Sequence, residues 1–168
     1  MKTVPRLPLT IVLNNLRSAY NVGSVLRSAD VVWIDRVITC GVTPRVDHPK
    51  VKKTALGSEV IVRTTHHTTL PACVRSLRAG GVRVCAMEPA PGAVSLWDVP
   101  AVQLAAPLAL IFGNEVDGVP LPELIALGVE LWTLPQFGVK SSLNVSVAAS
   151  VVMYHIRHTV TVAGLLPR

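Results

Sequence analysis

Short apolar runs alternate along the chain with segments whose apolar residues recur at helical spacing. The runs are rich in aliphatic and β-branched residues, which is typical of strands buried in a parallel sheet. The strands predicted in this way are residues 9–13, 37–40, 60–62, 82–87, 108–112 and 129–134, with a further short one near 94–97. Residues 70–79 and 121–127 predict helices that end at glycines. This alternation predicts an α/β fold built on a parallel sheet.

The segment after the first strand predicts a helix with one apolar face. Asn21 is the expected N-cap, because its side-chain oxygen can accept a hydrogen bond from a backbone N–H of the first turn. Four apolar residues follow at the spacing i, i+3, i+4 and i+7, namely Val22, Val25, Leu26 and Ala29. Arg27 falls outside this face. Residues 41–49 predict a turn-rich loop that runs into the basic stretch 48–53.

Residues 141–154 predict a last helix, with Ser141 or Ser142 as its cap. Its residues are apolar on nearly every side, so we expect the helix to be buried. Its opening turns nevertheless carry Ser142, Asn144 and Ser146. Each of these polar groups would cost about 1–3 kcal/mol if it were buried without a partner. We therefore expect a polar partner to meet them.

The length of 168 residues fits a single domain with one continuous core, and half of the residues are hydrophobic. We expect residues 1–168 to form that domain, with no separate recognition domain. The longest uncharged runs, 99–114 and 141–156, are shorter than the roughly 20 residues of a membrane span. No apolar signal region follows Lys2, and the three cysteines are scattered. These features favour a soluble protein of the reducing cytoplasm.

The net charge of +6 is concentrated in the first part of the chain. Residues 1–63 hold ten Lys and Arg against four Asp and Glu, whereas residues 64–168 hold six of each. Two interpretations have about equal weight on charge alone: a solvated basic surface, or a surface that contacts the phosphates of a polyanion.

Several familiar motifs of catalytic or metal-binding proteins are absent. There is no Gly-x-Gly-x-x-Gly fingerprint, phosphate-binding loop, Gly-x-Ser-x-Gly elbow or Cys-x-x-Cys pair. His155 and His158 lie one helical turn apart but lack a third ligand nearby, so we interpret them as surface residues and expect no metal site. The three cysteines, Cys40, Cys73 and Cys85, have apolar neighbours and are expected to be buried thiols.

Three polar segments remain, each at the end of an apolar run. They are residues 21–27, 113–118 and 137–144, and they overlap the stretches 21–30 (NVGSVLRSAD), 110–118 (LIFGNEVDG) and 142–149 (SLNVSVAA). In residue type and order they resemble the three motifs of the SpoU/TrmH branch of the SPOUT RNA methyltransferases, and residues 54–59 (TALGSE) also resemble a stretch common in these proteins. One departure is Gln136-Phe137 after Pro135, where the family often has Pro-Met-x-Gly.

The resemblance implies a fold and a cofactor. Members of this family thread the C-terminal segment through a loop to form a deep trefoil knot, a rare exception to the rule against knotted chains. S-adenosylmethionine binds in the knot, and the family is homodimeric, with sites that draw on both subunits. By resemblance, the cofactor pocket of this chain would be formed by Phe112, Gly113, Asn114, Leu134, Pro135, Ser142 and Leu143.

The reaction implied by the resemblance is methyl transfer to a ribose 2′-hydroxyl of RNA. Arg27 would stabilise the developing alkoxide and the neighbouring phosphate, whereas an arginine holds its proton too tightly to be an ordinary base. Asn21, Glu115, Ser142 and Asn144 match the other motif positions and would orient Arg27, cofactor and ribose. Local roles remain open for each: helix caps for Asn21 and Ser142, a loop carboxylate for Glu115, and a buried amide for Asn144.

The substrate is expected to be structured RNA, with transfer RNA favoured over ribosomal RNA. By resemblance, relatives that act on ribosomal RNA often carry an extra N-terminal recognition domain and some tRNA enzymes add terminal helices, and this chain has neither in full. RNA contacts are expected from the basic residues Arg17, Arg27, Lys50, Lys52 and Lys53. Two alternatives remain open. One is a catalytically inactive RNA-binding or assembly protein on the same fold, and the other is a small-molecule enzyme.

Overall fold

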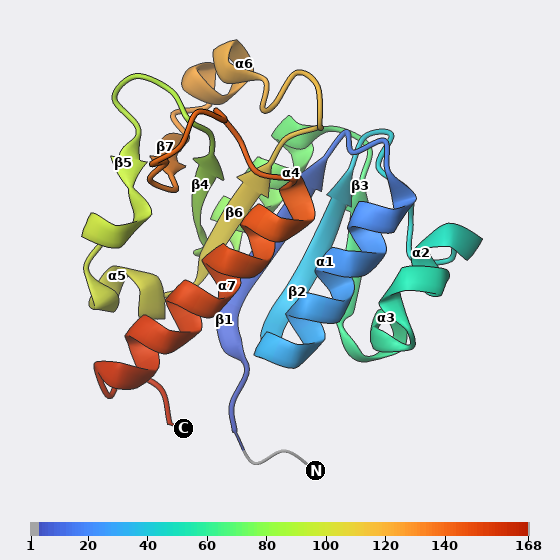
Figure 1. Cartoon of the computed structure of the whole chain (residues 1–168), viewed down its shortest axis with the longest axis horizontal. Helices are drawn as coiled ribbons and strands as arrows, with labels where there is room; N and C mark the ends of the chain where they lie inside the picture. The colour runs from blue at the N-terminus through green and yellow to red at the C-terminus, as the bar shows by residue number, and fades with distance from the viewer. Residues whose placement is uncertain (1–3, 168) are drawn as a thin grey trace.

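A parallel sheet forms the centre of the molecule in the computed structural model, which describes residues 4–167 (Figure 1). Within these residues, seven strands pair in the order β3-β2-β1-β6-β4-β7-β5, and every pair of neighbours is parallel. The strands are β1 (Leu7–Asn14), β2 (Ile34–Cys40), β3 (Arg63–His67), β4 (Arg83–Met87), β5 (Val94–Ser95), β6 (Leu108–Phe112) and β7 (Glu130–Thr133). The predicted α/β fold is confirmed.

Helices cover both faces of the sheet. One face carries α1 (Ala19–Val32), α2 (Pro49–Ala55), α3 (Ser58–Ile61), α5 (Ala101–Ala105) and α7 (Val145–Val162). The other face carries α4 (Leu70–Ala79) and α6 (Leu121–Ala126). In Figure 1, α1 and α7 lie side by side across the central strands. No helix within residues 4–167 has the length and apolar character needed to cross a membrane.

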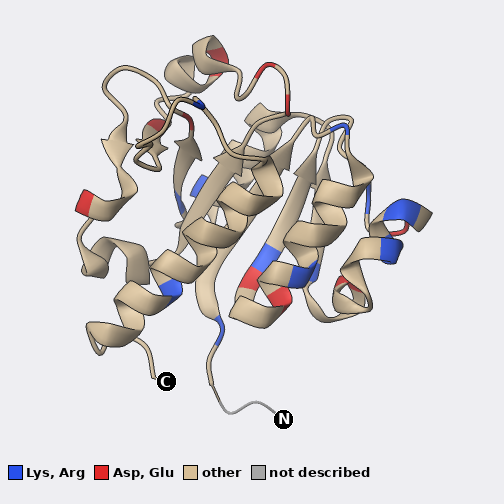
Figure 2. Ribbon diagram, in the orientation of Figure 1, with Lys and Arg blue, Asp and Glu red and all other residues tan. Residues whose placement is uncertain are grey.

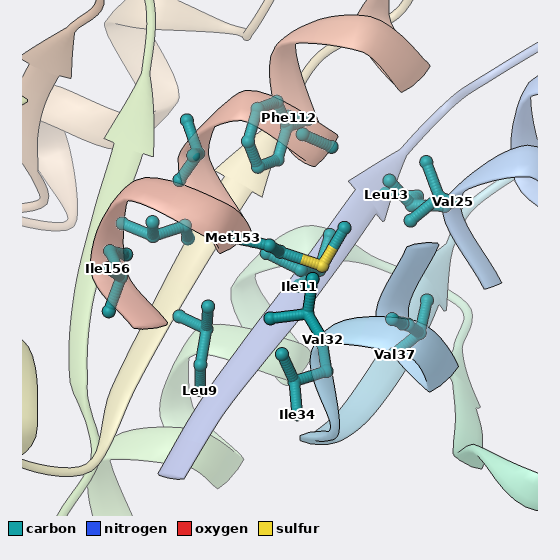
Figure 3. Packing of buried hydrophobic residues seen from close by; sticks show 14 of the residues in the cluster. Leu9, Ile11, Leu13, Val25, Val32, Ile34, Val37, Phe112, Met153 and Ile156 are labelled. Atoms are coloured by element: carbon teal, nitrogen blue, oxygen red, sulfur yellow. The ribbon is translucent and has the colours of Figure 1, made fainter. Parts of the chain in front are cut away.

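The alternation of side chains along β1 divides the core into two layers. Leu9, Ile11 and Leu13 face α1 and α7, whereas Val12 faces α4. Figure 3 shows Met153 of α7 packed over the side of the sheet that carries Leu9 and Ile11. Because both faces are covered, β1 and β6 consist of almost continuously buried residues, as their short apolar runs predicted.

The third predicted strand was wrong in position. Residues 60–62 were expected to be a strand, but β3 is Arg63–His67, and Val60 and Ile61 belong to α3. The prediction took the apolar run 60–62 for a buried strand, but Val60 is 80% exposed. An edge strand pairs with only one neighbouring strand and is partly exposed to solvent. A polar sequence such as Arg-Thr-Thr-His-His can therefore form β3.

The short helices were not predicted. Only Val51 and Ala55 of α2 are buried, too few for a recognisable apolar periodicity, and α3 and α5 are one turn or little more. In the 94–97 region, the strand is limited to β5 and is followed by the short 3₁₀ helix η1 (Leu96–Asp98). The expectation of buried cysteines is confirmed for Cys40, Cys73 and Cys85.

The predicted ends of the two long helices were also wrong. Ser18 caps α1 instead of Asn21, and Asn144 caps α7 instead of Ser141 or Ser142. The last helix continues to Val162, eight residues beyond the predicted end. It also buries one face only, because Val147, Val151 and Tyr154 are exposed in the single chain.

Candidate active site

A pocket of about 990 Å³ opens where the carboxyl ends of β4, β6 and β7 meet. Ligands of parallel α/β proteins usually bind at this edge of the sheet. The loops that follow β6 and β7 form most of the wall, and the first turn of α7 completes it. All seven residues that the family resemblance assigned to the cofactor line this pocket: Phe112, Gly113, Asn114, Leu134, Pro135, Ser142 and Leu143.

The loop after β6 is braced by one of its own side chains. Asn114 Oδ1 accepts hydrogen bonds from the backbone N–H groups of Val116 (2.9 Å) and Asp117 (2.8 Å). The backbones of Asn114 and Gly118 exchange two further hydrogen bonds of 3.1 Å. Asn114 therefore shapes the pocket wall as well as lining it.

Glu88, which the sequence analysis did not single out, supports the same loop from the end of β4. Its Oε2 accepts a hydrogen bond of 3.1 Å from the backbone N–H of Val119. Its backbone N–H donates to the carbonyl of Trp132 in β7. The one sequence feature that could have pointed to Glu88 is its position directly after a buried strand, where polar residues of α/β proteins often belong to the binding site.

The Glu115 carboxylate connects the β6 loop to the beginning of α1. One oxygen accepts a hydrogen bond from the backbone N–H of Arg17 (3.2 Å). The other accepts from the backbone N–H of Ser18 (3.3 Å) and from the side-chain amide of Asn21 (2.8 Å). The carboxylate thus lies at the positive end of the helix dipole of α1, where negative charge is stabilised.

This arrangement resembles a capping box whose carboxylate comes from a distant loop. Ser18 Oγ accepts the N–H of Asn21 at the third helical position, as an N-cap serine does. In an ordinary capping box, the side chain of the third helical residue accepts a hydrogen bond from the N-cap backbone N–H. Here Glu115 accepts the N–H of Ser18 instead. The side-chain oxygen of Asn21 is therefore free for another contact.

Asn21 uses this freedom to reach the third motif. Its Oδ1 accepts a hydrogen bond of 3.3 Å from Nδ2 of Asn144. The Oδ1 of Asn144 in turn accepts from the backbone N–H of Ser146 (2.9 Å) and from its hydroxyl (2.7 Å). A polar chain from Glu115 through Asn21 to Asn144 therefore joins the three motifs. These contacts also provide the polar partners that the sequence demanded for Asn144 and Ser146, although Asn144 is an exposed cap and not a buried amide.

The hydrogen bonds hold Glu115 in its charged form. Partial burial raises the pKa of this carboxyl, but hydrogen bonds from the Arg17 backbone, from its own backbone, from Asn21 and from the Ser18 backbone lower it by more. The net result is a pKa below the ordinary value of a glutamate. Glu115 is thus a charged hydrogen-bond acceptor that holds the N–H groups of Arg17, Ser18 and Asn21 in place.

The loop of residues 135–143 has an unusual backbone. Within the described part of the chain, no backbone hydrogen bond involves these nine residues. Ser142 is exposed in this loop and lines the pocket without a hydrogen-bond partner among residues 4–167. Backbone N–H and C=O groups need partners, so the loop offers a ligand a series of free donors and acceptors.

Arg27 does not reach the pocket of its own chain. It lies six residues beyond Asn21 in α1, which corresponds to about 9 Å along the helix axis. It is exposed, is not part of the pocket wall, and forms no hydrogen bond or ion pair with the residues that the structure describes. Its catalytic role stays a prediction.

The other basic residues expected to contact RNA are all exposed. Lys50, Lys52 and Lys53 belong to α2, which carries blue segments in Figure 2, although other basic segments are spread over the molecule. Arg17 lies 3.9 Å from Asp117, in a pair whose side chains are 68% and 71% exposed. Such a pair contributes little to stability, so Arg17 is available to a phosphate.

The histidines follow no metal-binding pattern. His155 is partly buried, and its ring lies 6.5 Å from that of Trp97. Burial and the nearby His158 lower the pKa of His155 below the ordinary value of a histidine, although a hydrogen bond to the backbone of Leu96 opposes this. Among residues 4–167, no group of three His, Cys, Asp or Glu side chains is placed to hold a metal ion.

Comparison with known proteins identifies the fold and the family. The chain is 32% identical over 160 residues to the tRNA (guanosine(18)-2′-O)-methyltransferase of Thermus thermophilus, with 95% of this chain and 79% of that protein aligned. It is 31% identical over 147 residues to the 23S rRNA (guanosine(2553)-2′-O)-methyltransferase RlmP of Bacillus subtilis, covering 88% of this chain but 57% of that one.

A solved structure from work on the 2-OH methylation of C/U34 on tRNA superimposes with a TM-score of 0.78 at 27% identity. The match covers 91% of this chain and 96% of the solved one. The family model of the SpoU rRNA methylases matches residues 8–154, which include all three motifs. The chain therefore belongs to the SpoU rRNA methylase family.

Proposed function

We propose that this chain transfers a methyl group from S-adenosylmethionine to a ribose 2′-hydroxyl of RNA. The observation that carries the proposal is the polar chain Glu115–Asn21–Asn144 at the pocket. It assembles the three motifs of the family beside the residues expected to bind the cofactor. The family match and the enzymes to which the chain is similar, which methylate 2′-hydroxyls of tRNA or rRNA, support the same reaction class.

The residues of the pocket fit S-adenosylmethionine. The cofactor combines an adenine ring, a ribose and a charged methionine part, and so needs both apolar walls and many hydrogen-bond partners. Phe112, Leu134 and Pro135 supply apolar wall. The free backbone groups of residues 135–143 supply donors and acceptors without any charged side chain being required. When bound, the cofactor supplies an electrophilic methyl group.

The protein must make the 2′-hydroxyl nucleophilic. Arg27 stabilises the alkoxide that develops as the 2′-hydroxyl passes its proton to solvent, together with the adjacent phosphate, because a guanidinium carries a positive charge and donates several hydrogen bonds. Asn21 and Asn144 are fixed by Glu115 and Ser146, so their amides can orient the ribose without reorganising during the reaction. Ser142 adds a free hydroxyl on the pocket wall.

Two copies are needed to complete this site, and we propose a homodimer. Tyr20, Arg27 and Val31 lie on one exposed face of α1, at spacings of seven and four residues. The adjacent α7 exposes Val147, Val151 and Tyr154. Packing this apolar surface against a second copy would bury it and bring Arg27 of one copy toward the pocket of the other.

The contact between the two helices supports this arrangement. Ser28 and Ser150 share a hydrogen bond of 2.7 Å between α1 and α7, which keeps the two helices close. Because α1 and α7 pack together, their exposed residues form one continuous surface, which could meet its own copy about a two-fold axis, as isologous interfaces require.

We further propose that the last segment forms the trefoil knot of the family. The loop after β7 and the loop after β6 line the same pocket, and α7 then crosses back to pack against α1. A chain that passes between such loops before returning would be knotted. Among RNAs, tRNA is the proposed substrate. We propose that the chain binds it in the cytoplasm as a single domain, with the lysines of α2 contacting phosphates.

A titration with S-adenosylhomocysteine tests the proposal. Calorimetry on the folded protein should detect binding, and 2′-O-methyl mapping in RNA from a deletion strain should reveal one lost modification. A folded protein that produces no heat at millimolar ligand is not a methyltransferase. If such a protein still binds RNA, the inactive RNA-binding alternative is correct.

A further inference from the structure

Two aromatic side chains beside the pocket are largely uncovered. Trp97 lies in η1 and Phe137 in the 135–143 loop, and their ring centroids are 5.8 Å apart with an interplanar angle of 28°. Trp97 is 51% exposed and Phe137 is 84% exposed. The stack therefore covers one face of Phe137 and leaves the other face open.

The exposure of these two aromatic rings needs an explanation. An aromatic ring can bury about 150–250 Å² of surface, so leaving it in water forgoes a large stabilisation. Phe112 and Trp132 are buried in the core, and the indole N–H of Trp33 donates to the carbonyl of Val4. Exposed apolar groups that adjoin a pocket usually mark a binding surface.

The surroundings of Phe137 indicate what kind of ligand fits. Phe137 lines the cofactor pocket, and three residues further along the same loop lies Lys140. Lys140 is the one Lys or Arg in the described wall of that pocket, which otherwise holds the carboxylates Glu88, Glu115 and Asp117. An open aromatic face with a cation a few residues away matches a nucleobase and its phosphate, as in proteins that bind single-stranded RNA.

We propose that Phe137, backed by Trp97, is a stacking platform for an unpaired nucleobase next to the reacting ribose, with Lys140 contacting an adjacent phosphate. The base stacks on the open face of Phe137, because rings 5.8 Å apart leave no room for a third ring between them. Trp97 is a positioning residue that holds Phe137 in place. The inference rests on the proposed function and specifies how that site selects its substrate.

The platform makes the enzyme selective for unpaired nucleotides. In duplex RNA each base is already stacked and paired within the helix, so its face is not available to Phe137. A nucleotide in a loop can turn its base outward and gain the stacking contact. Stacking tolerates any base, so the platform selects exposed nucleotides without reading their sequence.

The first test compares two substitutions of Phe137. Phe137→Leu keeps an apolar side chain against Trp97 but removes the aromatic face, whereas Phe137→Tyr keeps the face. Binding is measured with an RNA hairpin that has an unpaired loop and with a blunt duplex of equal length. Phe137→Leu should weaken hairpin binding by roughly 5- to 100-fold, and Phe137→Tyr should bind like wild type. Affinity for the duplex should be unchanged in both variants.

The second test uses tryptophan fluorescence and the cofactor product. The hairpin should quench the wild-type emission and quench Trp97→Phe less, whereas Trp33→Phe should be quenched as strongly as wild type. The platform is refuted if Phe137→Leu binds the hairpin as tightly as wild type. It is also refuted if the variant loses affinity for S-adenosylhomocysteine to the same extent, because the pair would then only brace the cofactor loop. Failure of wild type to bind S-adenosylhomocysteine would instead count against the proposed function.

Discussion

Glu115 and Asn21 are 94 positions apart in the chain, yet the Glu115 carboxylate accepts a hydrogen bond of 2.8 Å from the Asn21 amide. The same carboxylate accepts the backbone N–H groups of Arg17 and Ser18 at the start of α1. One side chain from the β6 loop therefore fixes both the beginning of a helix and the orientation of an amide at the site.

Replacing Glu115 by glutamine should reveal this double role. The substitution removes a charge at the N-terminus of α1 and puts an N–H where an acceptor is needed, so the free energy of unfolding should fall by about 1 kcal/mol at pH 7. Denaturant titrations of both proteins measure the difference. Methylation should fall by more than the loss of folded protein explains, because Asn21 loses its anchor.

The stability difference should depend on pH with a definite sign. The pKa of Glu115 is lowered in the folded protein, so its contribution is fully present above the ordinary value of 4.5 and is lost as the pH falls through the lower folded value. Glu115→Gln and wild type should therefore converge in stability as the pH falls through the lowered folded pKa of Glu115. A difference that stays constant from pH 7 to pH 3 would show that the charge of Glu115 contributes nothing.

Substitution of Arg27 tests the mechanism directly. Arg27→Ala should lower the saturated single-turnover rate by roughly 10²–10³-fold, by analogy with the removal of one oxyanion donor. Cofactor affinity should hardly change, and stability should change by less than about 0.5 kcal/mol because the side chain is exposed. Lys52→Ala is the control, since a phosphate contact should weaken RNA binding and its salt dependence but leave the saturated rate intact. A wild-type rate for Arg27→Ala would make Arg27 an ordinary surface charge.

A charge placed on α7 should separate the two copies. Val151→Asp puts a carboxylate in the exposed apolar surface of α1 and α7, where a second copy would have to desolvate it. Light scattering on a sizing column should report a monomer, and methylation should be lost because Arg27 no longer reaches a partner pocket. Ile125→Asp on α6 is the control, since Ile125 is 66% exposed and lies away from α1 and α7. A wild-type protein that runs as a monomer at micromolar concentration would contradict the proposed assembly.

Two glycines of the pocket should respond differently to alanine. A Cβ on Gly113 would lie 1.9 Å from the backbone carbon of Gly118, so the β6 loop would have to open. A Cβ on Gly138 would meet no atom within 4 Å. Calorimetry with S-adenosylhomocysteine should show at least about a tenfold loss of affinity for Gly113→Ala, and near wild-type affinity for Gly138→Ala. Equal affinities would show that the close approach of Gly113 and Gly118 does not shape the cofactor site.

The sequence predicted the central strands well because their environment leaves a simple pattern. β1 and β6 are covered on both sides, so nearly every residue had to be apolar. β3 could not be placed, since an edge strand with polar residues has no such pattern, and α2 buries only two side chains. Periodicity detects burial, and these elements are poorly buried.

The sequence predicted several residues that line the pocket, but it did not predict the geometry of the pocket. Phe112, Gly113 and Leu134 could be assigned to the pocket because they end apolar strands and match family motifs. The contact between Glu115 and Asn21 could not be inferred, because no local pattern specifies which loop meets which helix. Asn21 was consequently mistaken for a cap, a role that belongs to Ser18.

The polar chain from Glu115 to Asn144 also determines when the protein can begin to work. Asn21 and Asn144 are 123 positions apart, and Arg157 of α7 donates hydrogen bonds to the carbonyls of Val32 and Trp33 at the end of α1. During synthesis, the first motif leaves the ribosome long before its partners in the third exist. The nascent chain therefore cannot assemble this site until its last helix is released and docks against α1.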